Sequence, residues 1–135
     1  MTKKKLRVLV DMTADIIHHG HIRILKKAYF YGKVIVALTT DKEVIKYKNK
    51  KPIFNFNQRK EILLSIKYVS KVIPSKWKID NDFLKKNKID ILIHGTDNSN
   101  NVAKEKVRIF KRTKNISSSQ IIKKIKNLKW TKILL

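Results

Sequence analysis

The chain has 135 residues with no cysteine, and its formal net charge is +23 at pH 7. A chain without cysteine has no disulfide framework, no thiolate nucleophile and no cysteine-bound zinc, which agrees with a reducing compartment. No apolar run approaches the ~20 residues that a membrane span needs. The short apolar run after the basic start does not reach the length of a signal-peptide core. We therefore expect a cytoplasmic protein with a single domain over residues 1–135, a core at about 6–127 and a tail at 128–135.

The positive charge is distributed along the whole sequence. Lys and Arg together number 33, and 28 of them are Lys. A nucleic-acid-binding protein usually gathers its basic residues in a patch or a block. Dispersed lysines in a chain rich in Ile and Asn are typical of solvated surface positions, and they also suit a polyanionic small substrate. Nucleic acid is therefore the less favoured partner.

The first half of the chain alternates strand and helix patterns. The continuous apolar run Leu6–Val10 predicts a strand that is buried on both faces. From residue 21 to 31 apolar residues recur at helical spacing, and Gly32 is predicted to end that helix as its C′ residue. Residues 34–40 predict a second buried strand. The polar and basic stretch 46–57 predicts a loop.

The second half continues the alternation. A helix is expected to begin near Asn57, followed by a short strand that ends at Pro74 and a short helix over 80–88. A buried strand is expected over 89–95 and a last strand over 107–110. A final helix is expected over 117–128, with three isoleucines turned inward: Ile121, Ile122 and Ile125.

This order predicts an α/β fold with a Rossmann-like, doubly wound parallel sheet of five strands. Ligands of such folds bind beyond the carboxyl ends of the strands. Three polar clusters, at residues 11–21, 94–98 and 111–119, each follow a predicted strand. We therefore expect all three clusters to line one pocket.

The first cluster contains three of the four histidines, in the sequence His18, His19, Gly20, His21. If a helix begins here, His18 and His21 lie on one face near its N-terminus. That end of a helix favours anions, and imidazole N–H groups can donate to a phosphate whose charge grows in a transition state. Gly20 is expected to leave room for a phosphate. A metal site and purely structural histidines are the alternatives.

The third cluster and two other features offer further anion contacts. Ser117 with Gln120 fits a helix cap, and the same hydroxyls near Arg112 also fit an anion cradle. The lysines at 46–51 are either a solvated loop or a basic flap over a triphosphate. Trp77 and Trp130 are either packing residues or base-stacking platforms.

The motif H-H-G-H after the first strand, together with R-T-x-x-I-S-S-S near the C-terminus, resembles the small cytidylyltransferases of the H-x-G-H nucleotidyltransferase superfamily. The resemblance covers about residues 6–127 and includes the stretches TTDKEVIK, QRKEILLSIKYVSKVIP and IDILIHGTD. Where the family usually has G-T-F-D, this chain has Met12, Thr13, Ala14 and Asp15. The chain also has ISSS where ISTT is more typical.

The resemblance implies that a phosphate oxygen of an acceptor attacks the α-phosphorus of a nucleoside triphosphate and displaces pyrophosphate, with Mg²⁺ carried mainly by the phosphates and no dedicated metal cage. It implies that the protein is a homodimer without a membrane span. Catalytic roles are expected for His18, His21, Lys48 and Arg112. Acceptor contacts are expected for Arg59, Trp77 and Lys67, which stands where the family often has Arg. The nucleotide is expected to contact Met12, Thr13, Asp15, Gly20, His21, Gly95, Asp97, Arg112, Thr113, Ile116, Ser117 and Ser118.

The predicted reaction is transfer of CMP from CTP to a small phosphorylated alcohol of the glycerol phosphate, phosphocholine or phosphoethanolamine type. Two alternatives stay open. One is an adenylyltransferase that uses ATP, for example one that makes FAD from FMN. The other is a basic module that binds nucleic acid or nucleotide without turnover, for which steeply salt-dependent binding would be the sign.

Overall fold

A computed structural model gives the fold and describes residues 5–96 and 98–128. One sheet of five parallel strands has the order β3-β2-β1-β4-β5. The strand order reverses between β1 and β4, as in a Rossmann-like doubly wound sheet. The predicted fold class is therefore confirmed. The strands are β1 (Leu6–Met12), β2 (Gly32–Thr39), β3 (Val69–Ser75), β4 (Ile91–Gly95) and β5 (Val107–Phe110).

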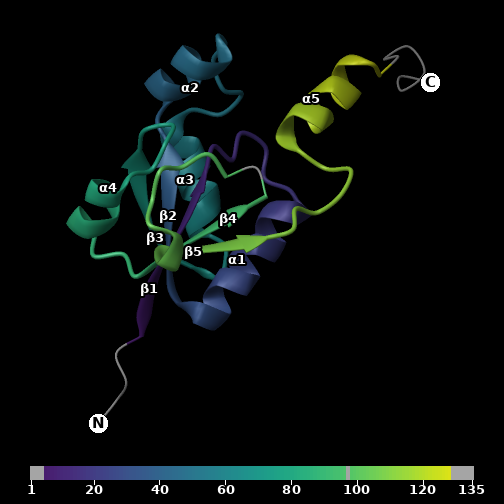
Figure 1. Cartoon of the computed structure of the whole chain (residues 1–135). Coiled ribbons are helices and arrows are strands. Elements are labelled where there is room, and N and C mark those ends of the chain that lie inside the picture. The colour runs from purple at the N-terminus through teal and green to yellow at the C-terminus, as the bar shows by residue number, and fades with distance from the viewer. Residues whose placement is uncertain (1–4, 97, 129–135) are drawn as a thin grey trace.

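Helices connect the strands and cover the sheet (Figure 1). Their order follows the predicted alternation, with one additional helix between β2 and β3. No helix among the described residues combines the length and apolar composition that crossing a membrane requires. The helices are α1 (His19–Tyr31), α2 (Asp41–Lys48), α3 (Phe56–Leu64), α4 (Asn81–Lys86), the 3₁₀ turn η1 (Lys104–Lys106) and α5 (Ser118–Lys126).

The core consists of two apolar layers, one on each face of the sheet. Alternate residues of a strand point to opposite faces, so Val8 and Leu9 enter different layers. The larger layer packs the sheet against Leu25 of α1 and Leu63 of α3. The second layer packs it against Leu84 of α4. Because both faces are covered at the centre of the sheet, the strands β1, β2 and β4 contain apolar runs, which is why the sequence predicted them well.

Helix α2 replaces the first part of the predicted loop at 46–57. Thr40 caps this helix by accepting a hydrogen bond from the backbone N–H of Glu43, and Asn49 ends it in a left-handed conformation with φ 55°. Val44 is its buried residue. A helix with so small an apolar face leaves little periodic signal in a sequence.

Gly32 ends α1 as its C-cap residue, but with an extended backbone (φ 160°) and not in the left-handed conformation of a C′ glycine. It opens β2 and pairs with Leu6 of β1. A Cβ at this position would lie 2.2 Å from the carbonyl oxygen of Leu6. Glycine is therefore required by the close approach of two backbones and not by a helix end.

The last helix differs from its predicted packing. Figure 1 shows α5 standing apart from the sheet. Ile125 was expected to face inward, but it is 46% exposed, and no residue of α5 is buried. Residues 129–135, which include Trp130, lie outside the described residues.

Candidate active site

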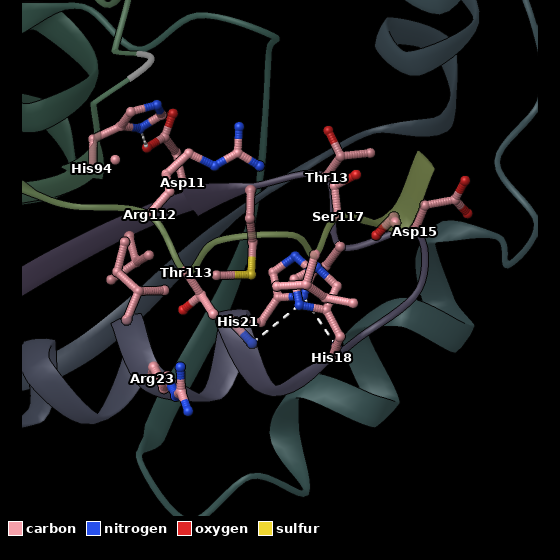
Figure 2. A pocket seen from close by; sticks show the side chains of 18 of the residues that line it. Asp11, Thr13, Asp15, His18, His21, Arg23, His94, Arg112, Thr113 and Ser117 are labelled. Atoms are coloured by element: carbon pink, nitrogen blue, oxygen red, sulfur yellow. Dashed lines mark hydrogen bonds and ion pairs between the residues drawn. The ribbon is translucent and has the colours of Figure 1, made fainter. Parts of the chain in front are cut away.

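The carboxyl ends of the strands and the N-terminal ends of α1 and α5 surround one cavity of about 550 Å³ (Figure 2). The three polar clusters therefore meet as expected, because parallel strands end at the same edge of a sheet. The predicted site residues that line this cavity are Met12, Thr13, Asp15, His18, Gly20, His21, Lys48, Trp77, Gly95, Arg112, Thr113, Ile116, Ser117 and Ser118.

His18 and His21 form the N-terminal cap of α1. His18 is the N-cap residue, and its Nδ1 accepts a hydrogen bond from the backbone N–H of Gly20 at 3.1 Å. In return, the backbone N–H of His18 donates to Nδ1 of His21 at 3.2 Å. This is the reciprocal arrangement of a capping box, made here by two imidazoles. The two rings lie 4.0 Å apart between centroids, and both line the cavity.

Both histidines are neutral at physiological pH. Burial, followed by electrostatic interactions with His18 and Arg112, lowers the pKa of His21 from 6.5 to about 3. Burial, His19 and Arg112 lower the pKa of His18. In a neutral ring one nitrogen carries the proton, and each Nδ1 is already an acceptor. The proton therefore lies on Nε2 of both rings, and each ring has one N–H group left to donate.

The absence of a side chain at Gly20 leaves room for the His18 ring. A Cβ at this position would lie 2.8 Å from Cε1 and 2.9 Å from Nδ1 of His18. We expected the missing side chain to clear room for a phosphate. The structure shows that it clears room for the His18 ring, which could not bond to the Gly20 amide with a methyl group in the way.

The C-terminal segment is joined to the loop after β1 by Ser118. Its hydroxyl donates to the carbonyl of Ile16 at 2.7 Å, and the Ile16 amide donates back to it at 3.1 Å. Ser117 caps α5 by accepting from the Gln120 amide at 3.1 Å. Before the cap, Asn115 has a φ of 61°, a conformation that Asn tolerates better than most residues. These bonds bring Arg112 and Thr113 to the cavity beside the two histidines.

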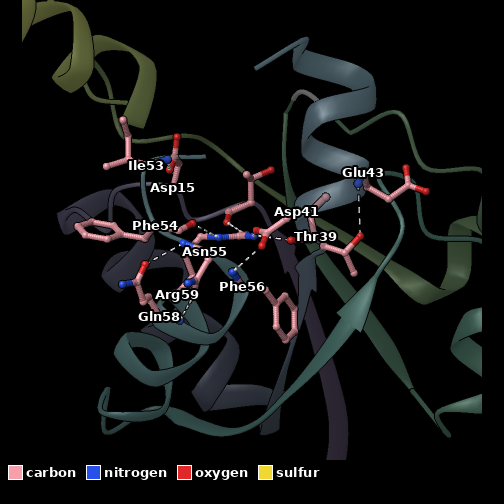
Figure 3. A network of polar contacts seen from close by, with 12 residues as sticks. Asp15, Thr39, Asp41, Glu43, Ile53, Phe54, Asn55, Phe56, Gln58 and Arg59 are labelled. Carbon is pink, nitrogen blue, oxygen red and sulfur yellow. Dashed lines mark hydrogen bonds and ion pairs between the residues drawn. The ribbon is translucent and has the colours of Figure 1, made fainter. Parts of the chain in front are cut away.

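Asp15 forms a hydrogen bond to the basic segment that precedes α3. This carboxylate is 6% exposed and accepts a hydrogen bond from the Ile53 amide at 2.7 Å. The bond connects the loop after β1 with the segment that follows α2 (Figure 3). Asp15 therefore borders the cavity and also fixes the position of a neighbouring loop.

The position of Arg59 does not agree with its predicted contact to the acceptor. We expected an acceptor contact, but this side chain has no exposed surface and does not line the cavity. Its guanidinium donates to the carbonyls of Thr13 and Thr39 at 2.7 and 2.9 Å and forms an ion pair with Asp41 at 2.6 Å (Figure 3). It also donates to the Phe54 carbonyl. Arg59 therefore positions the loops around the site.

The position of Lys67 also does not agree with its predicted contact to the acceptor. It is exposed and lies just before β3, which begins at Val69, so it stands at the amino end of a strand. The cavity lies at the carboxyl ends. The Lys67 ammonium lies over the ring of Tyr68 at 5.2 Å from its centroid. Asp97, expected to approach the nucleotide, lies outside the described residues.

A polar network on the cavity wall was not predicted from the sequence. Asp11, in β1, pairs with Nδ1 of His94, in β4, at 2.5 Å and accepts from the Asn100 side chain at 3.0 Å. Figure 2 shows this pair on the opposite side of the labelled residues from His18. The sequence shows that both residues follow apolar runs. It does not show that they pair, because the pairing depends on β1 and β4 being neighbours in the sheet. The cavity is also lined by Arg23, Lys27 and Phe110, which belong to none of the motifs or polar clusters.

The cavity offers two carboxylates as candidate ligands of a divalent cation, Asp11 and Asp15. Among residues 5–96 and 98–128, no three His, Asp or Glu side chains converge on one point. Asp11 and Asp15 both line the cavity, but both already accept hydrogen bonds.

Comparisons with known proteins agree with this geometry. The family model "Cytidylyltransferase-like" matches residues 9–124. Glycerol-3-phosphate cytidylyltransferase of Staphylococcus aureus is 39% identical over 121 residues, covering 85% of this chain and 91% of that protein. An FAD synthase of Pyrococcus horikoshii is 38% identical over 96 residues, covering 70% of this chain and 65% of that protein.

A solved structure supports the fold. The lipopolysaccharide core biosynthesis protein of Thermoplasma volcanium aligns with a TM-score of 0.67 at 24% identity, over 80% of this chain and 98% of that one. The family match spans β1 to α5 and includes both the histidine pair and the C-terminal serine segment. The chain therefore belongs to the cytidylyltransferase-like family of nucleotidyltransferases.

Proposed function

We propose that this enzyme transfers CMP from CTP to a small phosphorylated alcohol and releases pyrophosphate and a CDP-alcohol. The observation that carries the proposal is the pair of neutral imidazoles at the N-terminus of α1, each with its Nδ1 bonded to backbone and its Nε2–H free to donate. Two such donors on one cavity wall suit a phosphate that gains negative charge as it reacts. The similarity to a glycerol-3-phosphate cytidylyltransferase supports the choice of nucleotide and acceptor class.

This placement supports the following reaction. An oxygen of the acceptor phosphate forms a bond to the α-phosphorus of CTP, and the bond from that phosphorus to the bridging oxygen breaks in line. The electron pair leaves with pyrophosphate, so the protein need not take up a proton at any step. His18 and His21 donate from Nε2 to the α-phosphate oxygens, and Arg112 and Lys48 supply positive charge at the cavity. Mg²⁺ bound to the phosphates would neutralise charge on the leaving group.

Pyrophosphate release tests the proposal. The enzyme is incubated with Mg²⁺, either CTP or ATP, and one of four acceptors: glycerol phosphate, phosphocholine, phosphoethanolamine or FMN. We expect release with CTP and one of the first three. Release with ATP and FMN would instead establish the second candidate, which the similarity to an FAD synthase favours. No release with any pair, together with steeply salt-dependent binding of DNA or RNA, would overturn the enzymatic proposal.

The neighbouring histidine provides a matched control for the pair. His18→Ala and His21→Ala each remove one Nε2–H donor, and loss of one such donor typically lowers turnover ~100-fold or more. His19 is exposed and does not line the cavity, so His19→Ala should keep turnover near that of the wild type. Equal losses in all three variants would mean that the pair acts on folding and not on the reaction.

A further inference from the structure

The end of α2 carries an aromatic stack that the reaction described above does not use. The Tyr47 ring lies parallel to the Trp77 indole, with 5.2 Å between centroids and 14° between planes. Trp77 lines the cavity, whereas Tyr47 does not and is 51% exposed. The two rings come from different segments, Tyr47 from α2 and Trp77 from the stretch after β3. A contact of this kind joins two parts of the cavity rim.

The stack lies next to Lys48 in sequence and in space. Val44, Tyr47 and Lys48 are spaced by three and four residues, so they share one face of α2. Val44 is buried, Tyr47 stacks on Trp77, and the Lys48 ammonium lies 6.0 Å from the centroid of Trp77. One aromatic ring therefore contacts both Tyr47 and the lysine that reaches the cavity.

The C-terminal end of α2 needs such a contact. Its N-terminal end is fixed by the ion pair between Asp41 and the buried Arg59, and its middle is fixed by Val44. Beyond Val44 the helix has one more turn before Asn49 ends it in a left-handed conformation. A last helical turn without a tertiary contact frays easily. Fraying of this turn would release Lys48 from the cavity.

We propose that Tyr47 is a positioning residue for the nucleotidyl transfer: its stack on Trp77 fixes the last turn of α2 and thereby holds the Lys48 ammonium at the cavity. Tyr47 itself touches no reactant. The inference rests on the proposed function, because the anion that Lys48 meets is a phosphate of the nucleotide or of the acceptor. As a consequence, removing the Tyr47 side chain should cause part of the loss of activity that removing the Lys48 side chain causes.

A double-mutant cycle tests this dependence. Tyr47→Ala should lower kcat/KM about tenfold, whereas Tyr47→Phe, which keeps the stacking ring, should stay within about twofold of the wild type. In a Lys48→Ala background, Tyr47→Ala should cost less than about twofold, since the positioned group is already gone. Additive losses in the double variant would overturn the proposal, because a general structural role acts independently of Lys48.

Two further variants separate stacking from stability. Tyr47→Leu keeps an apolar side chain but cannot stack, so it should behave like Tyr47→Ala. Tyr29 is the matched control, because it is 52% exposed, packs against Tyr68 and lies outside the cavity. Tyr29→Ala should leave kcat/KM unchanged. A loss in Tyr29→Ala as large as that in Tyr47→Ala would assign the effect to a lost surface aromatic residue and overturn the proposal.

Binding of inorganic pyrophosphate supplies a readout that does not depend on turnover. Titration calorimetry should show weaker binding for Tyr47→Ala and Lys48→Ala to a similar degree, and unchanged binding for Tyr47→Phe. If the wild type binds pyrophosphate but turns over no substrate pair, the proposed function fails while the role of Tyr47 is still tested. Equal affinity in the wild type and Tyr47→Ala, or no binding by the wild type, would overturn the role of Tyr47.

Discussion

At the scale of single residues, the start of α1 and the histidine pair depend on the same two hydrogen bonds. The Gly20 amide donates to His18, and the His18 amide donates to His21. The bonds satisfy backbone donors that any helix leaves open, and they also fix the tautomer of both rings. These hydrogen bonds to the backbone therefore determine which ring nitrogen faces the cavity.

Gly20→Ala should separate activity from stability. The new methyl group would lie 2.8 Å from the His18 ring, so the ring has to move. We expect kcat to fall ~100-fold, because small displacements of positioned groups have effects of that size. The melting temperature should change little, because the loss of the His18 cap and the better helix propensity of Ala are each worth about 1 kcal/mol and offset each other. Turnover within threefold of the wild type would show that the ring position does not matter.

The lowered pKa of His21 predicts a pH dependence of stability. Above pH 6.5 the ring is neutral in both states and contributes nothing. Between pH 6.5 and about 3, the unfolded chain takes up a proton that the folded chain does not, so the unfolding free energy falls as the pH falls. The loss from this group reaches about 1.4 kcal/mol per pH unit.

His21→Gln removes that titration. Urea unfolding at several pH values should therefore give a shallower loss of stability for the variant than for the wild type below pH 6.5. The slopes should coincide above pH 7. Parallel curves across the whole range would contradict the lowered pKa.

Some of these residue roles could be predicted from the sequence, and others could not. The spacing of His18 and His21 was sufficient to place them together, because three residues separate neighbours on a helix face. The role of Gly20 was not visible, since it depends on the orientation of the His18 ring. Arg59 was assigned to the acceptor because sequence shows a charge but not its burial, and its partners are up to 46 residues away.

At the scale of elements, the strands were predictable and the surface helices were less so. Buried strands form apolar runs that end abruptly, as Val8–Val10 does before Asp11. Helix α2 has one buried residue and is defined mostly by the Thr40 cap, so its polar sequence resembled a loop. Helix α5 has a periodic set of isoleucines, but a periodic face does not say whether another element covers it.

Lys88 offers a prediction at the end of α4. It follows the helix with a φ of 54° and is exposed, in a position where Gly is preferred because a Cβ is strained. Lys88→Gly should raise the unfolding free energy by about 1 kcal/mol, as measured by urea unfolding. Lys88→Ala is the control, because it removes the charge and keeps the Cβ, and it should give no such gain. Equal effects of the two variants would point to the charge.

At the scale of the whole molecule, Arg59 joins segments that are distant in sequence. It reaches the loop after β1 through Thr13, the end of β2 through Thr39 and the start of α2 through Asp41. Thr13 and Thr39 line the cavity, so one buried side chain connects two segments of its rim with the start of α2 (Figure 3). The family resemblance indicated the reaction class, whereas this internal framework becomes visible in three dimensions.

Arg59→Met should lower the unfolding free energy by about 3 kcal/mol, because the carbonyls of Thr13 and Thr39 would lose their donor in a buried place. Asp41→Asn should cost less, about 1 kcal/mol, since the Asp41 side chain is 40% exposed and water can replace the ion pair. Denaturant unfolding of both variants measures the difference. A larger loss for Asp41→Asn would place the main contribution in the ion pair.

The histidine capping box also makes the state of the site observable from the backbone. The amides of His18 and Gly20 are protected from hydrogen–deuterium exchange while the two rings accept their hydrogen bonds. Exchange at these two amides therefore measures how often the rings leave their places. A bound nucleotide that restrains the rings would slow this exchange. NMR of these two backbone amides can therefore report how often both rings are in place for the reaction.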